Sequence, residues 1–104
     1  MYSIGMTYSL KPGCYPDYKK SHDELWPEIA ENMAVNNVSM IIYSYGDRLF
    51  LHANAPSQED WLKSREGPDL ERWTEYMVNY LVTDDKGQII FEEMEVAFVF
   101  GVFK

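Results

Sequence analysis

Two histidines, His22 and His52, are the side chains of this 104-residue sequence best suited to proton transfer. Imidazole changes charge near neutral pH, so it can accept a proton and return it. His22 follows Tyr18 by one helical turn and precedes Trp26 by another. A phenol, an imidazole and an indole along one stripe are typical of a sugar pocket with an acid/base group. Core packing with satisfied polar tips gives the same spacing, so the spacing alone leaves both interpretations open.

The other reactive residue types give weaker signals. His52 alternates with Phe50 and Asn54, which is typical of a solvated or hydrogen-bonded histidine in a strand. Cys14 has only Lys11 as a cationic neighbour, so the sequence does not predict a thiolate nucleophile. The two histidines and the scattered carboxylates lack the spacing of metal ligands, and no glycine-rich phosphate loop is present.

The charge of the chain restricts its partners. Lys and Arg total 9 against 17 Asp and Glu, a formal net charge of −8, which disfavours nucleic acid and favours a neutral or cationic ligand. The longest strongly apolar stretch, residues 96–103, is far shorter than the ~20 residues of a membrane span, so no membrane partner is expected. A single cysteine and an N-terminal segment without a secretory pattern indicate a cytoplasmic protein.

The hydrophobic pattern predicts the elements that position these side chains. Strands are expected over residues 2–10, 38–45, 49–53 and 89–103, and helices over residues 16–35 and 57–81. Pro27 is expected to kink the first helix, and Gly67-Pro68 to interrupt the second. The order strand, helix, strand, strand, helix, strand predicts one α+β domain over residues 1–104. Its expected fold is ferredoxin-like βαββαβ, an antiparallel four-stranded sheet with helices on one face.

The second face of such a sheet needs a cover that so short a chain does not supply. The last predicted strand is bulky on both faces toward its end. A second copy of the same sheet is the simplest cover, so the sequence predicts a homodimer.

The motif residues resemble those of a known family. They are Tyr18, His22, the run Trp26-Pro27-Glu28, Trp61, the run Glu71-Arg72-Trp73, Tyr76-Met77 and the closing residues 93–98. With these motifs the whole chain resembles the L-rhamnose mutarotase family. The resemblance implies a dimeric α/β-barrel enzyme, an isomerase that interconverts the α and β anomers of a free 6-deoxyhexose without a cofactor. It also implies that His22 is the proton donor and that Tyr18 and Trp73 contact the sugar.

Two positions depart from the family pattern. Ile41 stands where the family has a substrate-contacting Tyr, and Thr74 where it has a second Trp. The loop between the middle strands is shorter as well, so Tyr43 could supply the phenol instead of residue 41. The predicted substrate-binding set is therefore Tyr18, Trp26, Ile41, Tyr43, Trp73 and Thr74. These departures leave open whether the sugar is L-rhamnose or a related one such as L-fucose.

Other functions are compatible with this fold class. Dimeric proteins of this size include cofactor-independent monooxygenases and haem-degrading enzymes, and a helical His near Trp suits a haem. A non-catalytic sugar-binding module is a further alternative, which would bind a sugar without accelerating its anomeric exchange. The partner of His22 in proton transfer also stays open between Tyr18, a water molecule and a carboxylate.

Overall fold

The computed structural model describes residues 1–103 of the chain. Its strands are β1 (Tyr2–Ser9), β2 (Ser39–Tyr45), β3 (Arg48–Ala55) and β4 (Glu92–Glu93). Its helices are α1 (Tyr15–Asp23), α2 (Pro27–Val35), α3 (Gln58–Ser64) and α4 (Pro68–Met77), with a short 3₁₀ helix, η1, at Gly101–Phe103. None of the helices within residues 1–103 is long and apolar enough to cross a membrane.

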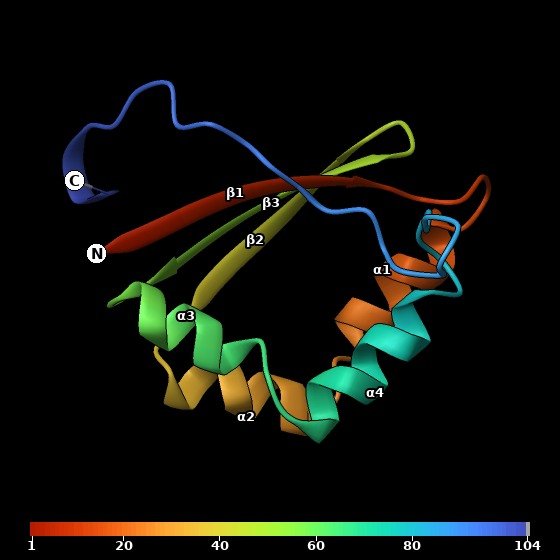
Figure 1. Ribbon diagram of the computed structural model, residues 1–104, viewed down its shortest axis with the longest axis horizontal. Helices are drawn as coiled ribbons and strands as arrows, with labels where there is room; N and C mark the ends of the chain where they lie inside the picture. The colour runs from red at the N-terminus through yellow and green to blue at the C-terminus, as the bar shows by residue number, and fades with distance from the viewer. Residues whose placement is uncertain (104) are drawn as a thin grey trace.

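The four strands form one antiparallel sheet in the order β2-β3-β1-β4. Leu51 in the middle of β3 pairs with Met6 of β1 on one side and with Ile42 of β2 on the other. The helices lie together on one side of the sheet, and the C-terminal segment runs on the other side (Figure 1). This topology confirms the predicted α+β, ferredoxin-like fold.

The core lies between the sheet and the helices because side chains alternate between the two faces of each strand. In β3 the buried residues are Leu49, Leu51, Ala53 and Ala55, each separated by one partly buried residue. The buried hydrophobic residues that complete the core are Tyr8, Leu10, Tyr18, Ile29, Trp61, Leu70, Trp73, Met77 and Leu81. Aromatic residues thus make up a large share of the core, and the candidate site lies among them.

Pro27 divides the first predicted helix into two, which corrects the expectation of one kinked helix. Glu24, Leu25 and Trp26 are not helical, and Trp26 has the extended backbone angle ψ 134°. A residue before proline is pushed out of the helical region, while proline itself fits the first turn of a helix. The break therefore lets α1 and α2 take separate directions, with Trp26 at the corner between them.

The second predicted helix is also two helices, as the Gly67-Pro68 interruption indicates. Gly67 has φ 106°, a backbone conformation that favours glycine, and α4 begins at the following proline. The Ser57 hydroxyl caps α3 by accepting from the Asp60 amide at 3.2 Å. The end of α4 at Met77 precedes the expected end at Leu81, and Leu81 instead forms an isolated antiparallel bridge to Leu10, which directly follows β1.

The last strand is much shorter than predicted. Only Glu92–Glu93 has strand structure, followed by one more bond from the Met94 amide to the Gly5 carbonyl at 2.8 Å. A Cβ on Gly5 would lie 3.1 Å from Met94 Cε, so the small side of β1 allows this close approach. Residues 94–103 are exposed. Their apolar pattern indicates that they need burial, but a pattern does not supply the neighbouring strand that a longer β4 would pair with.

Candidate active site

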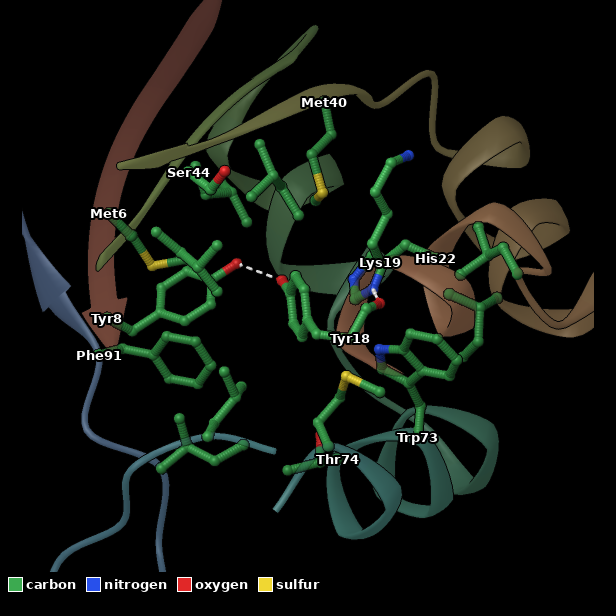
Figure 2. A pocket seen from close by; sticks show the side chains of 18 of the residues that line it. Met6, Tyr8, Tyr18, Lys19, His22, Met40, Ser44, Trp73, Thr74 and Phe91 are labelled. Carbon is green, nitrogen blue, oxygen red and sulfur yellow. Dashed lines mark hydrogen bonds between the residues drawn. The ribbon is translucent and has the colours of Figure 1, made fainter. Parts of the chain in front are cut away.

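A cavity of about 430 Å³ opens between the sheet and helices α1 and α4 (Figure 2). Its volume lies in the range of about 300–1,000 Å³ that is typical of small-molecule sites. Polar groups on its wall come from Tyr8, Tyr15, Tyr18, Lys19, His22, Asp23, Ser44, Arg65, Trp73 and Thr74. The remaining wall is mostly aliphatic or sulfur-containing side chains of the strands and of α2. A largely apolar pocket with a few polar groups is the common form of a ligand site.

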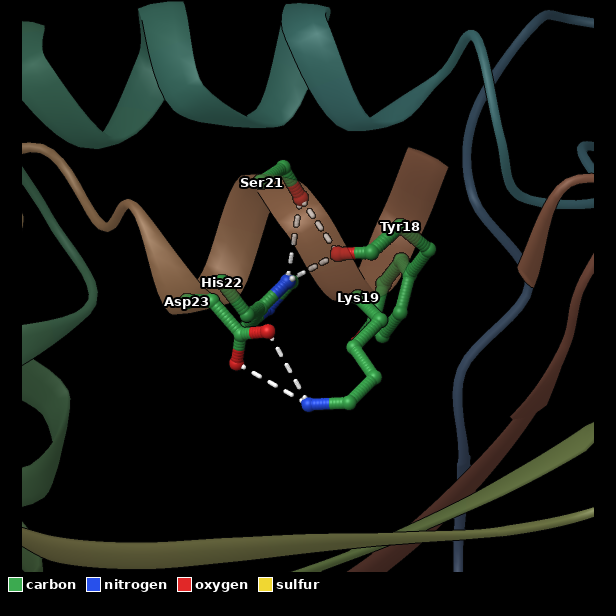
Figure 3. A network of polar contacts seen from close by, with 5 residues as sticks. All are labelled: Tyr18, Lys19, Ser21, His22 and Asp23. Atoms are coloured by element: carbon green, nitrogen blue, oxygen red, sulfur yellow. Dashed lines mark hydrogen bonds and ion pairs between the residues drawn. The ribbon is translucent and has the colours of Figure 1, made fainter. Parts of the chain in front are cut away.

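The orientation of His22 is fixed by a hydrogen bond to its own helix. His22 Nδ1 lies 3.0 Å from the carbonyl oxygen of Tyr18, one turn earlier in α1 (Figure 3). A carbonyl oxygen only accepts, so Nδ1 carries the hydrogen of the neutral ring and Nε2 carries the lone pair. Ser21 Oγ donates to the same carbonyl at 2.6 Å and lies 3.2 Å from Nδ1. The helix therefore presents His22 to the cavity as a base at Nε2.

The surroundings keep His22 neutral. Burial lowers its pKa below the ordinary value of 6.5, and the cation of Arg65 acts in the same direction. The bond to the Tyr18 carbonyl and the carboxylate of Asp23 oppose this shift without outweighing it. Among residues 1–103, every buried side-chain polar atom has a hydrogen-bond partner. His22 Nε2 has no such partner, so it is not buried and is accessible. A neutral imidazole with an accessible lone pair is suited to accept a proton from a hydroxyl.

Two phenols form the polar floor beside His22. The hydroxyls of Tyr8 and Tyr18 lie 2.9 Å apart, and the ring of Tyr18 lies 4.2 Å from that of His22 between centroids. Both side chains are buried, and burial raises the pKa of each phenol. The phenols therefore stay protonated at neutral pH and can donate a hydrogen bond to a ligand.

Indole rings form the wall on the helical side. The Trp73 ring meets His22 edge to face at 5.3 Å between centroids. Trp26 meets Trp73 edge to face at 5.0 Å and stacks on Tyr76 at 5.6 Å with planes 10° apart. Trp73 lines the cavity, whereas Trp26 supports it from behind and is not part of the lining. The structure thus gives these two predicted residues different positions.

The residues predicted to select the sugar fall on different sides of the sheet. Thr74 borders the cavity from α4. Ile41, on the edge strand β2, reaches the cavity wall but is 46% exposed and pairs with His52. Tyr43 is 61% exposed and lines a hollow on the opposite sheet face together with His52. The alternation of β2 explains this placement, because Met40, Ile42 and Ser44 face the helices while Ile41 and Tyr43 face away. The structure therefore does not bring Tyr43 to His22, and a phenol is available from Tyr8 instead.

Tyr8 and Arg65 are polar residues of the cavity that the predicted set lacks. Tyr8 reaches it as a core-facing residue of β1, and the alternation of that strand could have indicated its side. Arg65 ends α3 and lines the cavity near Tyr8, Tyr18 and His22. In the sequence, an arginine two residues before Gly67-Pro68 is typical of an exposed helix end, so nothing there indicated a pocket residue.

The remaining charged groups at the cavity belong to its rim. Lys19 Nζ binds the Asp23 carboxylate at 3.0 Å, and both side chains are exposed. Within residues 1–103, no group of three His, Cys, Asp or Glu side chains is arranged to hold a metal ion.

The chain is similar to known proteins along most of its length. Residues 3–100 match the family model described as L-rhamnose mutarotase. The chain is 26% identical over 93 residues to the L-rhamnose mutarotase of Pectobacterium carotovorum, covering 86% of this chain and 89% of that protein. It is 27% identical over 92 residues to that of Listeria monocytogenes, covering 86% and 88%.

Solved structures show the same fold. The crystal structure of L-rhamnose mutarotase from Formosa agariphila superposes with a TM-score of 0.82 at 19% identity, over 97% of this chain and 100% of that one. A dimeric ferredoxin-like protein from an uncultured marine organism has a TM-score of 0.60 at 15% identity, over 95% and 98%. The match of the family model over residues 3–100 also confirms the resemblance noted in the sequence. The chain belongs to the L-rhamnose mutarotase family.

Proposed function

We propose that this chain is an isomerase that interconverts the α and β anomers of L-rhamnose by acid/base catalysis at His22, without a cofactor. The observation that carries this proposal is the fixed, neutral imidazole with Nε2 accessible at a sugar-sized cavity. Membership of the L-rhamnose mutarotase family supports the reaction and the sugar.

The reaction follows from the groups around His22. Nε2 accepts the proton of the anomeric hydroxyl, and the bond from C1 to the ring oxygen breaks as the aldehyde forms. A protonated phenol of the Tyr8–Tyr18 pair donates a hydrogen bond to the departing ring oxygen. Rotation about C1–C2 presents the other face of the aldehyde, the ring closes, and His22 returns the proton. General acid/base help of this kind typically contributes about 10²–10⁴-fold in rate.

The cavity wall suits a deoxysugar. Trp73 and Tyr18 offer aromatic surface to the C–H faces of the sugar, and Trp26 holds Trp73 in place. The aliphatic strand side chains suit the methyl group of a 6-deoxyhexose, and a neutral sugar is compatible with the formal net charge of −8. Thr74 borders the same space from α4, so we assign it to substrate selection.

Saturation-transfer NMR between the two anomeric protons tests the activity directly. The chain should accelerate exchange for L-rhamnose well beyond the rate in buffer, and a panel containing L-fucose and D-glucose defines the selectivity. Exchange at the buffer rate for every sugar in the panel would refute the proposed function. Binding without acceleration would identify a sugar-binding module instead.

We also propose that two copies pair through the sheet face that carries no helices. Phe98 and Phe100 are 82% and 77% exposed there, which is unusual for a monomer of this size. The similarity to a dimeric ferredoxin-like protein supports this arrangement. Sedimentation should give twice the chain mass of 12.2 kDa, and Phe98→Asp should lower it while Leu62→Asp, on exposed α3, should not. A monomer for the unmodified chain at micromolar concentration would contradict the proposal.

The setting we propose for this activity is the cytoplasm. A single cysteine, Cys14, is typical of a chain that folds in a reducing compartment. A free monosaccharide substrate is compatible with that setting.

A further inference from the structure

Arg65 is held at the cavity by the end of α3. Its backbone follows Ser64, whose carbonyl oxygen accepts from Asn32 Nδ2 of α2 at 2.8 Å. Its guanidinium carbon lies 5.4 Å from the centroid of the Trp61 ring, which supports one side of the guanidinium. The side chain lines the cavity that also receives Tyr8, Tyr18 and His22.

The positive charge of Arg65 has no counter-charge in the part of the chain that the structure describes. Arg48 pairs with Glu92 and Arg72 with Asp69, whereas Arg65 forms no ion pair and no side-chain hydrogen bond among residues 1–103. The one carboxylate among the described lining residues is Asp23, which Lys19 holds at the rim.

A partly buried cation without a counter-charge is unfavourable and therefore uncommon. Such a group is found where a ligand or a transition state supplies the missing negative charge. The proposed substrate is neutral before the reaction. In ring opening, negative charge develops on the sugar oxygen that leaves C1.

We propose that Arg65 is a catalytic residue whose guanidinium donates to the sugar ring oxygen and stabilises the negative charge that it gains as the ring opens. This inference rests on the proposed mutarotase function. It also identifies the partner of His22 that the sequence left open, with the Tyr8–Tyr18 hydroxyls as neighbouring donors.

The electrons and protons of the step balance within the site. His22 Nε2 takes the anomeric proton, and the O1–H electron pair forms the second bond of the aldehyde. The C1–O5 bond breaks, and its electron pair stays on O5 beside Arg65. In ring closure O5 attacks the other face of C1, the aldehyde pair returns to O1, and the imidazolium gives its proton back to O1. Arg65 neither gains nor loses a proton, since its pKa is too high for that role.

Arg65 favours proton transfer to His22 as well as the breaking of the C1–O5 bond. Its cation lowers the pKa of His22, so it helps to keep the imidazole in the basic form. Other charged or titratable groups near His22 are Asp23 and Lys19 on α1, Tyr18 on the same helix and Tyr8 from β1. Among the described lining residues, Arg65 is thus the only cation that no carboxylate of the chain neutralises.

Substitution of Arg65 with a matched control tests the inference. Arg65→Gln should lower kcat for anomer exchange by about 10²-fold, the typical effect of one charge-stabilising donor, with KM changed less than about threefold. Arg65→Lys should recover part of this loss, on the order of tenfold, because it restores the charge without the fork of donors. Arg72→Gln removes an exposed arginine of α4 and should leave kcat within about twofold.

The pH profile separates a catalytic role from a structural one. In Arg65→Gln the pH at which half of the activity is reached should rise, because His22 loses a neighbouring cation. An unchanged kcat in Arg65→Gln would overturn the inference, and so would a loss confined to KM. A Lys variant as slow as the Gln variant would also overturn it.

Ligand binding gives a second measurement that needs no turnover. L-Rhamnonate is an open-chain anion whose carboxylate stands at C1, the carbon that the ring oxygen leaves in the proposed step, and L-rhamnitol is its neutral counterpart. The unmodified chain should bind the anion more tightly than the polyol, and Arg65→Gln, or Arg65→Met if that variant does not fold, should remove this difference. Equal affinities of the unmodified chain for both compounds would contradict a role for Arg65. Failure of the proposed function itself appears separately, as buffer-rate exchange of L-rhamnose in the unmodified chain.

Discussion

One histidine lies on each side of the sheet, and the two histidines have different surroundings. On the helical face, His22 borders a cavity, bonds through Nδ1 to the Tyr18 carbonyl and contacts Trp73. On the other face, the ring of His52 lies 5.2 Å from that of Phe103 in the C-terminal segment. Residue type alone would give both the same chemistry. The comparison shows that a fixed tautomer and a cavity of ligand size make one of them a candidate catalyst.

The faces also differ in how they are covered. Helices bury one face and leave a pocket of about 430 Å³ between the layers. The other face has only the exposed residues 94–103 beside it, along which apolar side chains point to solvent. The first arrangement suits a small molecule, and the second suits a flat, apolar protein partner.

The strongest contrast between the faces is expected from substituting each histidine in turn. His22→Asn should lower the rate of anomer exchange by about 10²–10⁴-fold, because the proton acceptor is lost while the amide can still donate to the Tyr18 carbonyl. His52→Asn is the matched control and should change the rate less than about twofold. Saturation-transfer NMR on L-rhamnose measures both, and circular dichroism shows whether each variant folds. Equal losses in the two variants would remove the distinction between the faces.

The phenol pair on the helical face should couple activity to stability. Tyr18→Phe leaves the buried Tyr8 hydroxyl without its 2.9 Å partner, at a cost of about 1–3 kcal/mol in the free energy of unfolding. We expect it to slow anomer exchange about tenfold, by loss of a donor to the sugar.

The double variant separates these two effects. Tyr8→Phe combined with Tyr18→Phe should recover much of the stability, since no hydroxyl is left unpaired, but should not recover the rate. Urea unfolding and NMR exchange give the two quantities. Recovery of both together would mean that the phenols act only through folding.

The pH dependence of the rate should reflect the surroundings of His22. Burial disfavours the imidazolium, so the basic form persists to lower pH than in an ordinary histidine. Exchange should rise with pH and level off with a midpoint below 6.5. Below 6.5 the unfolded chain takes up this proton before the folded chain does, so the folded state should also lose stability as the pH falls. A rate midpoint at or above 6.5 would contradict the assignment of His22 as a buried neutral base.

The smallest effect is expected at Tyr43, on the face without helices. Tyr43→Phe removes a hydroxyl that faces away from the cavity, so the rate should stay within about twofold. A loss comparable to that of Tyr18→Phe would show that residues of the second face reach the substrate.

Much of the fold could be predicted because each element had a local signal. The alternation in β1, the break at Gly67-Pro68 and the Ser57 cap all agree with the structure. The extent of the last strand could not be predicted, because its pairing depends on which surface lies beside residues 94–103. Pro27 was expected to bend a helix, but its effect on the residue before it ends α1 altogether.

The candidate site was predictable where one helix determines it. Tyr18 and His22 lie one turn apart, so their stripe could be inferred from spacing, and the structure brings both to the cavity with Trp73. Side chains that reach the site from other elements could not be inferred from spacing in this way. The side chain of Arg65 reaches the cavity only because α3 ends against α2, which is a property of tertiary packing.

The rate of anomer exchange of L-rhamnose at pH 7, measured by saturation-transfer NMR, is the most direct test of this account. The unmodified chain and His52→Asn should both accelerate exchange to a similar extent, and His22→Asn should leave it close to the rate in buffer. Folded His22→Asn with the rate of the unmodified chain would contradict the central role of His22.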